Sequence, residues 1–96
     1  MLHILLAAAA AVLVGAAVVA VLHWQRVQRE ITMHKIKDGF AKVYDDGMRD
    51  GYHVVNIDIF DRSGSQQTTR VIKAKELDEE TERRLRDAGG IVRVTT

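Results

Sequence analysis

Histidine is the side chain best suited to proton transfer or metal binding near neutral pH, and the chain has four histidines. They are His3, His23, His34 and His53. His3 and His23 bracket an uncharged run, and His34 and His53 lack the spacing of a zinc-binding pair. The chain has no cysteine, which excludes thiolate ligands and disulfides. The sequence therefore predicts no metal site and no cofactor.

Carboxylates cluster at two places where a cation site or an acid–base pair is conceivable. The segment DDGMRDGY (45–52) lacks the alternating ligands and closing glutamate of an EF-hand loop, so its two Asp-Gly pairs indicate turns. The spacing of Asp58 and Asp61 is more typical of a solvated strand face and a turn entry. A nucleophile motif and a glycine-rich phosphate loop are also missing from the sequence. We expect no catalytic residues and predict that the chain is not an enzyme.

Basic side chains are in local excess around the last predicted helix, which raises the question of an anionic partner such as lipid or nucleic acid. They are Lys73, Lys75, Arg83, Arg84 and Arg86. Glutamates interleave with these arginines, the net charge is only +1, and no aromatic residues for base stacking accompany them. The pattern favours a self-neutralised solvent face and predicts no nucleic-acid partner. Phe60, Lys73 and Lys75 form a candidate surface for a protein partner.

The elements that would position these residues begin with an uncharged run from Ile4 to Leu22. About 19 residues at ~1.5 Å each span about 28 Å, close to the thickness of a bilayer core. Only three residues precede the run and none is lysine or arginine, which argues against a cleaved signal peptide. The sequence predicts a retained transmembrane helix over residues 1–24. The alternative is a helix buried inside a large assembly.

The two ends of this predicted helix suggest its surroundings. Trp24 occupies the place of an interfacial aromatic residue, and Arg26 and Arg29 follow it as membrane-interface cations. The positive-inside rule then places the C-terminal domain on the cytoplasmic side, or on the capsid-facing side in a virus. Ala7, Ala11 and Gly15 recur every four residues, as in a helix–helix packing face, although an alanine-rich composition gives such spacings by chance.

The remaining sequence predicts an α+β fold. Apolar residues at helical spacing predict a connecting amphipathic helix over residues 25–48. Residues 49–96 then predict a small ββαβ portion that packs against this helix. Its strands are HVVNIDIFDR, QTTRVIKAK and IVRVT, and its helix has Asp78 as N-cap and ends at Gly89. The expected domain is therefore αββαβ, with three strands in one sheet and two helices, behind a single N-terminal transmembrane helix.

These expectations combine into two hypotheses about function. The first is a non-enzymatic, single-pass membrane-anchored structural or assembly protein, which holds a small interaction domain at a membrane surface within a larger complex. One form of it is a virion membrane protein that links bilayer and capsid. The second is a membrane-tethered binding module or regulator that recruits a soluble partner or anionic lipid. The expected partners are the lipid bilayer and other protein subunits, most simply further copies of the chain.

Overall fold

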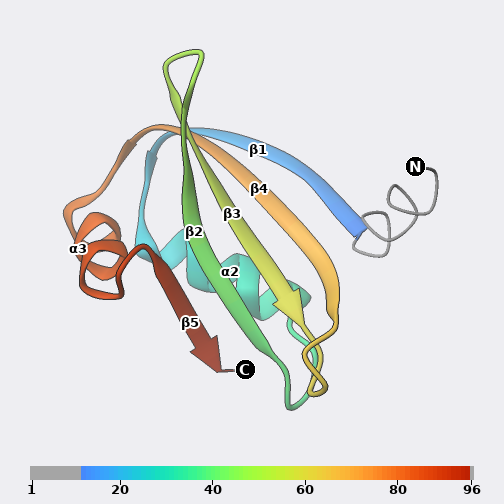
Figure 1. The fold of residues 1–96 in the computed structure, drawn as a ribbon. Helices are drawn as coiled ribbons and strands as arrows, with labels where there is room; N and C mark the ends of the chain where they lie inside the picture. Colours follow the sequence, from blue (N-terminus) through green and yellow to red (C-terminus); the bar gives the residue numbers. More distant parts are fainter. Residues whose placement is uncertain (1–11, 96) are drawn as a thin grey trace, which may run out of the picture.

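The computed structural model describes residues 12–95, in which five strands and two helices follow one another (Figure 1). In chain order they are β1 (Val12–Leu22), α2 (Trp24–His34), β2 (Phe40–Arg49), β3 (Tyr52–Phe60), β4 (Gln66–Leu77), α3 (Glu79–Asp87) and β5 (Ile91–Thr95). The strands form one sheet in the order β1-β4-β3-β2-β5. β1 pairs with β4 in parallel, and the other pairs are antiparallel. β1 and β5 are therefore the outer strands of the described sheet.

The prediction of a transmembrane helix over residues 1–24 is wrong, because Val12–Leu22 is a strand of the sheet. None of the helices in the described part of the chain has the length and apolar character needed to cross a membrane. An apolar run does not by itself distinguish a strand from a helix, and its β-branched valines favour extended backbone. The single-pass membrane anchor and the cytoplasmic or capsid-facing placement of the domain depended on that helix, and they are corrected with it. The structural, assembly and virion roles stay predictions.

The second half of the predicted connecting helix is also a strand. α2 ends at His34, and β2 begins at Phe40. Along β2 the side chains alternate, with Ala41 and Val43 fully buried and Lys42 on the opposite face. The expected three-stranded αββαβ domain is therefore replaced by a five-stranded mixed sheet with two helices.

The two Asp-Gly pairs near residue 50 have different structural roles. Asp50 and Gly51 both have positive φ, 54° and 82°, and they form the turn between the paired residues Arg49 and Tyr52. Two consecutive left-handed residues are the geometry of the tight hairpin turn that suits twisted strands. Gly47, with φ 105°, lies instead in the register shift of β2 between Asp45 and Met48. The second pair thus makes the hairpin, and the first makes a bulge within it.

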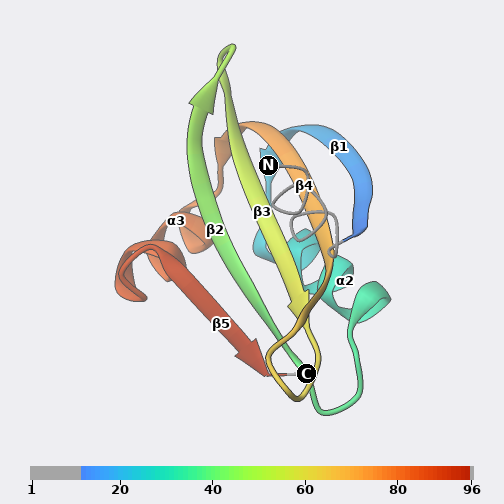
Figure 2. The same cartoon turned by 45° about the vertical axis from the view of Figure 1, so that its right-hand side comes forward.

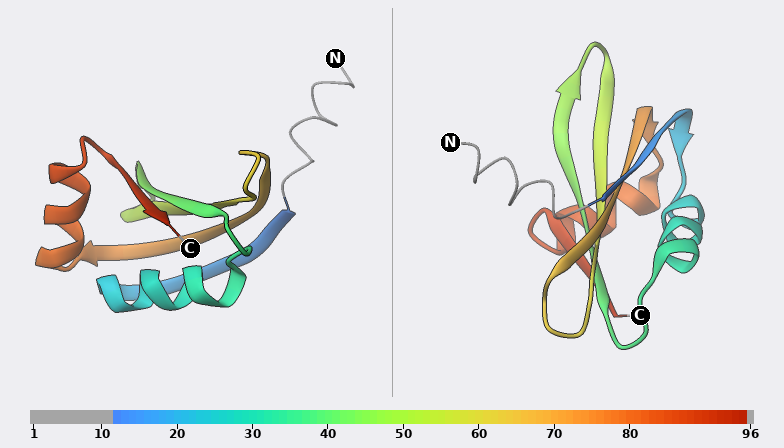
Figure 3. Two further views of the ribbon diagram at one scale, coloured as in Figure 1. Left: turned by 90° about the horizontal axis from the view of Figure 1, so that it is seen from below. Right: turned by 90° about the vertical axis from the view of Figure 1, so that its right-hand side faces the viewer.

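The hydrophobic core lies between α2 and one face of the sheet (Figure 3). Its largest buried side chains come from the end of β1, from α2 and from the central strands, and they are Leu22, Trp24, Val27, Ile31, Val43, Val55, Ile57, Ile59 and Ile72. Full burial of one such aliphatic side chain contributes roughly 1.5–3 kcal/mol. The core therefore fixes β3 and β4 under α2.

An ion pair inside this layer joins α2 to β4. The carboxylate of Glu30, a residue only 3% exposed, accepts a 2.6 Å hydrogen bond from Nε of Arg70. Nε of Arg26 lies 3.5 Å from the other oxygen of the same carboxylate. Because removing one partner of a buried pair is strongly destabilising, this contact constrains the position of the helix on the sheet.

The end of β1 is tied to the start of α3. The Leu22 carbonyl accepts hydrogen bonds from the Asp78 amide at 2.9 Å and from the Thr81 hydroxyl at 3.3 Å. Asp78 is the N-cap of α3 and accepts from the Thr81 amide at 2.8 Å. Its other oxygen lies 3.2 Å from Nδ1 of His23. These contacts hold the C-terminal end of β1 in place.

Candidate functional site

The outer side of β1, Val12–Leu22, is here called the β1 edge (Figure 2). β1 is 11 residues long and contains no charged residue and no proline. One side of it pairs with β4, and within residues 12–95 no strand pairs with the other side. Proteins usually protect such edges with charges, prolines or very short strands, because the unpaired backbone groups can bind another chain. The β1 edge has no charge, no proline and no short length to protect it, and its one irregularity is the register shift between Leu13 and Ala16.

From Ala16 to Val21, the side chains of β1 are alanines and valines that are partly or largely exposed. Ala17 and Val19 pack at the margin of the core, on the face that α2 covers. Val18 is 64% exposed on the opposite face, and Val21 is also exposed. Small apolar side chains on both faces leave room for an added strand and give it apolar surface to cover.

The opposite edge of the sheet is protected. β5 has five residues, Ile91–Thr95, and its middle residue is Arg93. A short strand with a charged residue at its centre is a poor template for pairing. The two edges of the described sheet therefore differ in length and charge, and only β1 has the features of a docking strand.

The sheet face that α2 does not contact is here called the uncovered face, and no described helix lies over it (Figure 3). Its side chains come from all five strands and include Val18, Phe40, Lys42, Tyr44, Asn56, Asp58, Phe60, Thr69, Lys73, Lys75 and Arg93. Phe40 and Phe60 stack with ring centroids 4.8 Å apart. The Arg93 guanidinium lies 4.0 Å from the Phe40 ring centre, and the Lys42 ammonium lies 5.3 Å from that of Phe60. Cation–π contacts thus order the cations on this face.

A comparison with protein-family models, curated proteins and solved structures gives no match. The function is therefore inferred from the surfaces and side chains of the structure itself.

The carboxylates on and near the uncovered face have structural partners. Asp58 is only 7% exposed and accepts a 3.0 Å hydrogen bond from the Thr69 hydroxyl. Burial, followed by the neighbouring Asp58 charge, raises the pKa of Tyr44 above its usual value. Asp61 lies in the turn after β3, where hydrogen bonds, first of all from the Ser63 hydroxyl, lower its pKa. The two aspartates thus have separate structural roles.

Two of the histidines pair with carboxylates. His23 contacts the N-cap aspartate of α3, and Nδ1 of His53 lies 2.7 Å from Oδ2 of Asp45. The His53 pair faces a shallow groove beside α3 that is also lined by Leu77 and Leu85. His34 is the last residue of α2, and His3 lies outside the described residues. Over residues 12–95 there is no group of three His, Cys, Asp or Glu side chains that could hold a metal ion.

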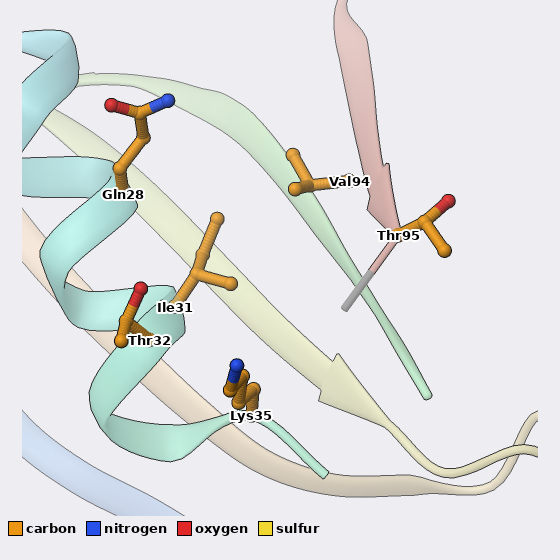
Figure 4. Close-up of a pocket in the computed structure, with 6 residues that line it drawn as sticks. All are labelled: Gln28, Ile31, Thr32, Lys35, Val94 and Thr95. Atoms are coloured by element: carbon orange, nitrogen blue, oxygen red, sulfur yellow. The ribbon is translucent and has the colours of Figure 1, made fainter. Parts of the chain in front are cut away.

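A second groove, of about 420 Å³, runs between α2 and β5 (Figure 4). Ile31 and Val94 supply its apolar walls, and Gln28, Thr32, Lys35 and Thr95 supply polar groups at its rim. This lining includes no acid–base pair and no nucleophile beside a base. The groove therefore offers no recognisable chemistry.

The residues expected at a membrane lie in different surroundings. Ala7 and Ala11 are outside the described residues, and Gly15 belongs to β1. Trp24 is 3% exposed at the start of α2, with the Arg84 guanidinium 4.9 Å from its ring centre. Of the two α2 arginines, Arg26 faces Glu30 and Arg29 is exposed.

The residues of the candidate partner surface all lie on the uncovered face. Phe60 is stacked on Phe40, while Lys73 and Lys75 are exposed on β4. The Lys75 ammonium lies 5.8 Å from the ring centre of Tyr52. Sequence reasoning missed the β1 edge, because the apolar run was assigned to a helix. It also missed the Phe40 contact, although the alternation of Lys42 with Ala41 and Val43 was a usable strand signal.

Proposed function

We propose that the chain is a non-catalytic assembly domain, which joins another protein subunit by adding a strand at the β1 edge. The observation that carries this proposal is the contrast between the two edges. β1 has 11 uncharged residues, whereas β5 has five residues with an arginine at the centre. A long, uncharged edge strand is a site for strand addition from another chain.

The fixed position of β1 supports this proposal. β1 is paired with β4 on both sides of a register shift between Leu13 and Ala16, and its last carbonyl is bound by the Asp78 amide and the Thr81 hydroxyl. A strand that is already ordered loses little conformational freedom when a partner pairs with it. Backbone hydrogen bonds supply affinity in this mode of recognition, and alternate side chains supply specificity.

The contacts of the titratable groups support a non-catalytic function. His23 and Asp78 lie at the N-terminus of α3, where the aspartate caps the helix. Asp61 orders a turn, and Asp58 binds Thr69 on the sheet. Each of these side chains has a structural contact that explains its position without a substrate.

The proposal is tested by placing a charge at the exposed centre of β1. Val18→Lys introduces the kind of residue with which natural edge strands prevent pairing. In extracts of the producing cells, we expect the wild-type chain to elute in a complex and Val18→Lys to elute at the mass of the monomer. Met33→Lys, at a 65% exposed position of α2, is the matched control and should elute with the wild type.

Two results would contradict the proposed function. The first is a wild-type chain that elutes as a monomer in these extracts. The second is a Val18→Lys chain that remains in the complex with the wild-type elution volume.

A second candidate function, recruitment of an acidic segment of a soluble protein, is favoured by the charges of the uncovered face. Lys42, Lys73, Lys75 and Arg93 lie on it, whereas Asp58 is buried and bound to Thr69. A labelled polyglutamate peptide should then bind, and Lys42→Glu/Arg93→Glu should weaken binding by about tenfold. Binding that is unchanged by this double substitution would exclude the uncovered face as the docking surface.

A further inference from the structure

We infer that the strand bound at the β1 edge is β1 of a second copy of the chain, paired antiparallel about a twofold axis at Val18. This inference rests on the proposed function and names its partner. It joins two five-stranded sheets into one continuous sheet of ten strands.

Charge is the first argument for a second copy at this edge. Because Val12–Leu22 has no charged side chain, two copies of it meet without like-charge repulsion at any position. At the other edge, twofold pairing about the middle of β5 would place Arg93 directly opposite Arg93 of the second copy. Self-pairing is therefore permitted at β1 and opposed at β5.

Only part of β1 is available for regular pairing with a second copy, and this part determines where the twofold axis lies. The register with β4 shifts between Leu13 and Ala16, which limits the regular strand at one end. At the other end the Leu22 carbonyl is already bound by the start of α3. The regular segment is thus Ala16–Val21, and Val18 near its middle is the most exposed of its large side chains.

The alternation of β1 is consistent with this register. In an antiparallel pair, opposite residues lie on the same face of the sheet. With Val18 on the axis, Ala16 lies opposite Ala20 of the second copy, and Ala17 lies opposite Val19. The two Val18 side chains then cover one another on the uncovered face. A shift of the pairing by one residue would oppose core-facing and outward-facing positions, so the face pattern excludes it.

The cysteine-free sequence allows a direct test with purified full-length chain. Val18→Cys should form a disulfide-linked dimer under mild oxidation, because opposite Cβ atoms on paired strands lie within about 5 Å. Met33→Cys, equally exposed on α2, is the control and should cross-link at least about tenfold less. Ala17→Cys mixed with Val19→Cys should link to each other, and this result fixes the register.

Sedimentation of the wild-type chain provides a measurement that depends on no substitution. We expect a dimer at micromolar concentration and a monomer for Val18→Lys. A purified wild-type chain that stays monomeric, or equal cross-linking of Val18→Cys and Met33→Cys, would overturn the second-copy assignment.

The two proposals fail in different ways. If the purified chain is monomeric while the complex in cell extracts still depends on Val18, the edge binds a different protein. In that case the proposed function stands, and the second copy is rejected. If the complex in extracts does not depend on Val18, the proposed function itself is rejected.

Discussion

Replacing Glu30 with alanine is expected to destabilise the fold by about 3 kcal/mol. Breaking a buried ion pair costs about 3–5 kcal/mol when one partner is removed. The Glu30 side chain is 4% exposed, but those of Arg70 and Arg26 are 19% and 32% exposed. Both cations can recover part of their hydration, so we expect the loss to lie at the lower end of that range.

This loss is large for a chain of 96 residues. At about 0.05–0.15 kcal/mol per residue, the whole free energy of unfolding is roughly 5–14 kcal/mol. Glu30→Ala should therefore remove about a fifth to three fifths of it and lower the melting temperature by about 12–24 °C. Since Glu30 and Arg70 join α2 to β4, the neighbour of β1, this prediction tests the support of the β1 edge.

Urea unfolding is the suitable assay, because the chain has one tryptophan and Trp24 is buried in the core. Its fluorescence should report the loss of packing between α2 and the sheet. Glu30→Gln keeps the shape of the side chain and should cost less than Glu30→Ala. Glu76→Ala, at an exposed position of β4, is the control and should change stability by less than about 0.5 kcal/mol. A Glu30→Ala loss below about 1 kcal/mol would refute the reasoning, because that is the range of an exposed ion pair.

Two further predictions concern α3 and the start of β2. Burial alone would raise the pKa of Asp78, but hydrogen bonds from Thr81 and His23 outweigh it and hold the pKa below its usual value. The Asp78 carboxylate therefore stabilises the fold above the unfolded pKa of about 3.9, and this contribution is lost as the pH falls through the lower folded value. In urea unfolding, Asp78→Ala should cost about 1 kcal/mol at pH 7 and less at pH 3, and an equal loss at both pH values would contradict the cap. Gly39→Ala would place its Cβ inside van der Waals contact with the Phe60 carbonyl oxygen, so it should cost about 1–3 kcal/mol. Gly64→Ala is the control, because Gly64 has a φ of 91° and open space where a Cβ would lie. It should cost about 1 kcal/mol from backbone strain alone. In the same assay Gly39→Ala should cost more.

The second half of the fold was predictable from local signals. The alternating residues of β3, the β-branched residues of β4 and the short run of β5 all form strands. Asp78 caps α3, Glu80 pairs with Arg84 four residues later, and Gly89 has the positive φ expected after the helix. Each of these signals is contained within a few residues, so no tertiary information was needed to interpret it.

The first half was not predictable in this way, because two segments carry an ambiguous pattern. The apolar run of β1 fits a helix or a strand, and the choice depends on a distant partner, β4. In β2, Phe40 and Val43 continue the spacing of the preceding helix by coincidence, while Ala41 and Val43 lie inside the sheet. Helical spacing and strand alternation can share positions over such a short stretch.

The β1 edge could not be predicted either, because it depends on the same ambiguous segment. An edge is a property of strand order, and the order β1-β4-β3-β2-β5 cannot be obtained from composition or periodicity. Gly15 was assigned to a packing face between helices, and the structure places it in the outer strand. The sequence shows that this segment is uncharged. In an edge strand the missing charges leave unpaired backbone groups unprotected, whereas in a helix only the side chains would be exposed.

The parallel pairing of β1 with β4 has a consequence for the order of folding. Among the described strands, β1 leaves the ribosome before the others and its partner β4 is the fourth, so β1 cannot dock until β4 has been synthesised. The β2–β3 and β3–β4 hairpins involve neighbouring segments and can form earlier, since closing short loops costs less entropy. During this interval the apolar β1 segment is unpaired in the nascent chain, because β4 has not yet been synthesised. Docking of β1 is therefore a late step of folding, and until then β1 is a target for chaperones that bind extended apolar segments.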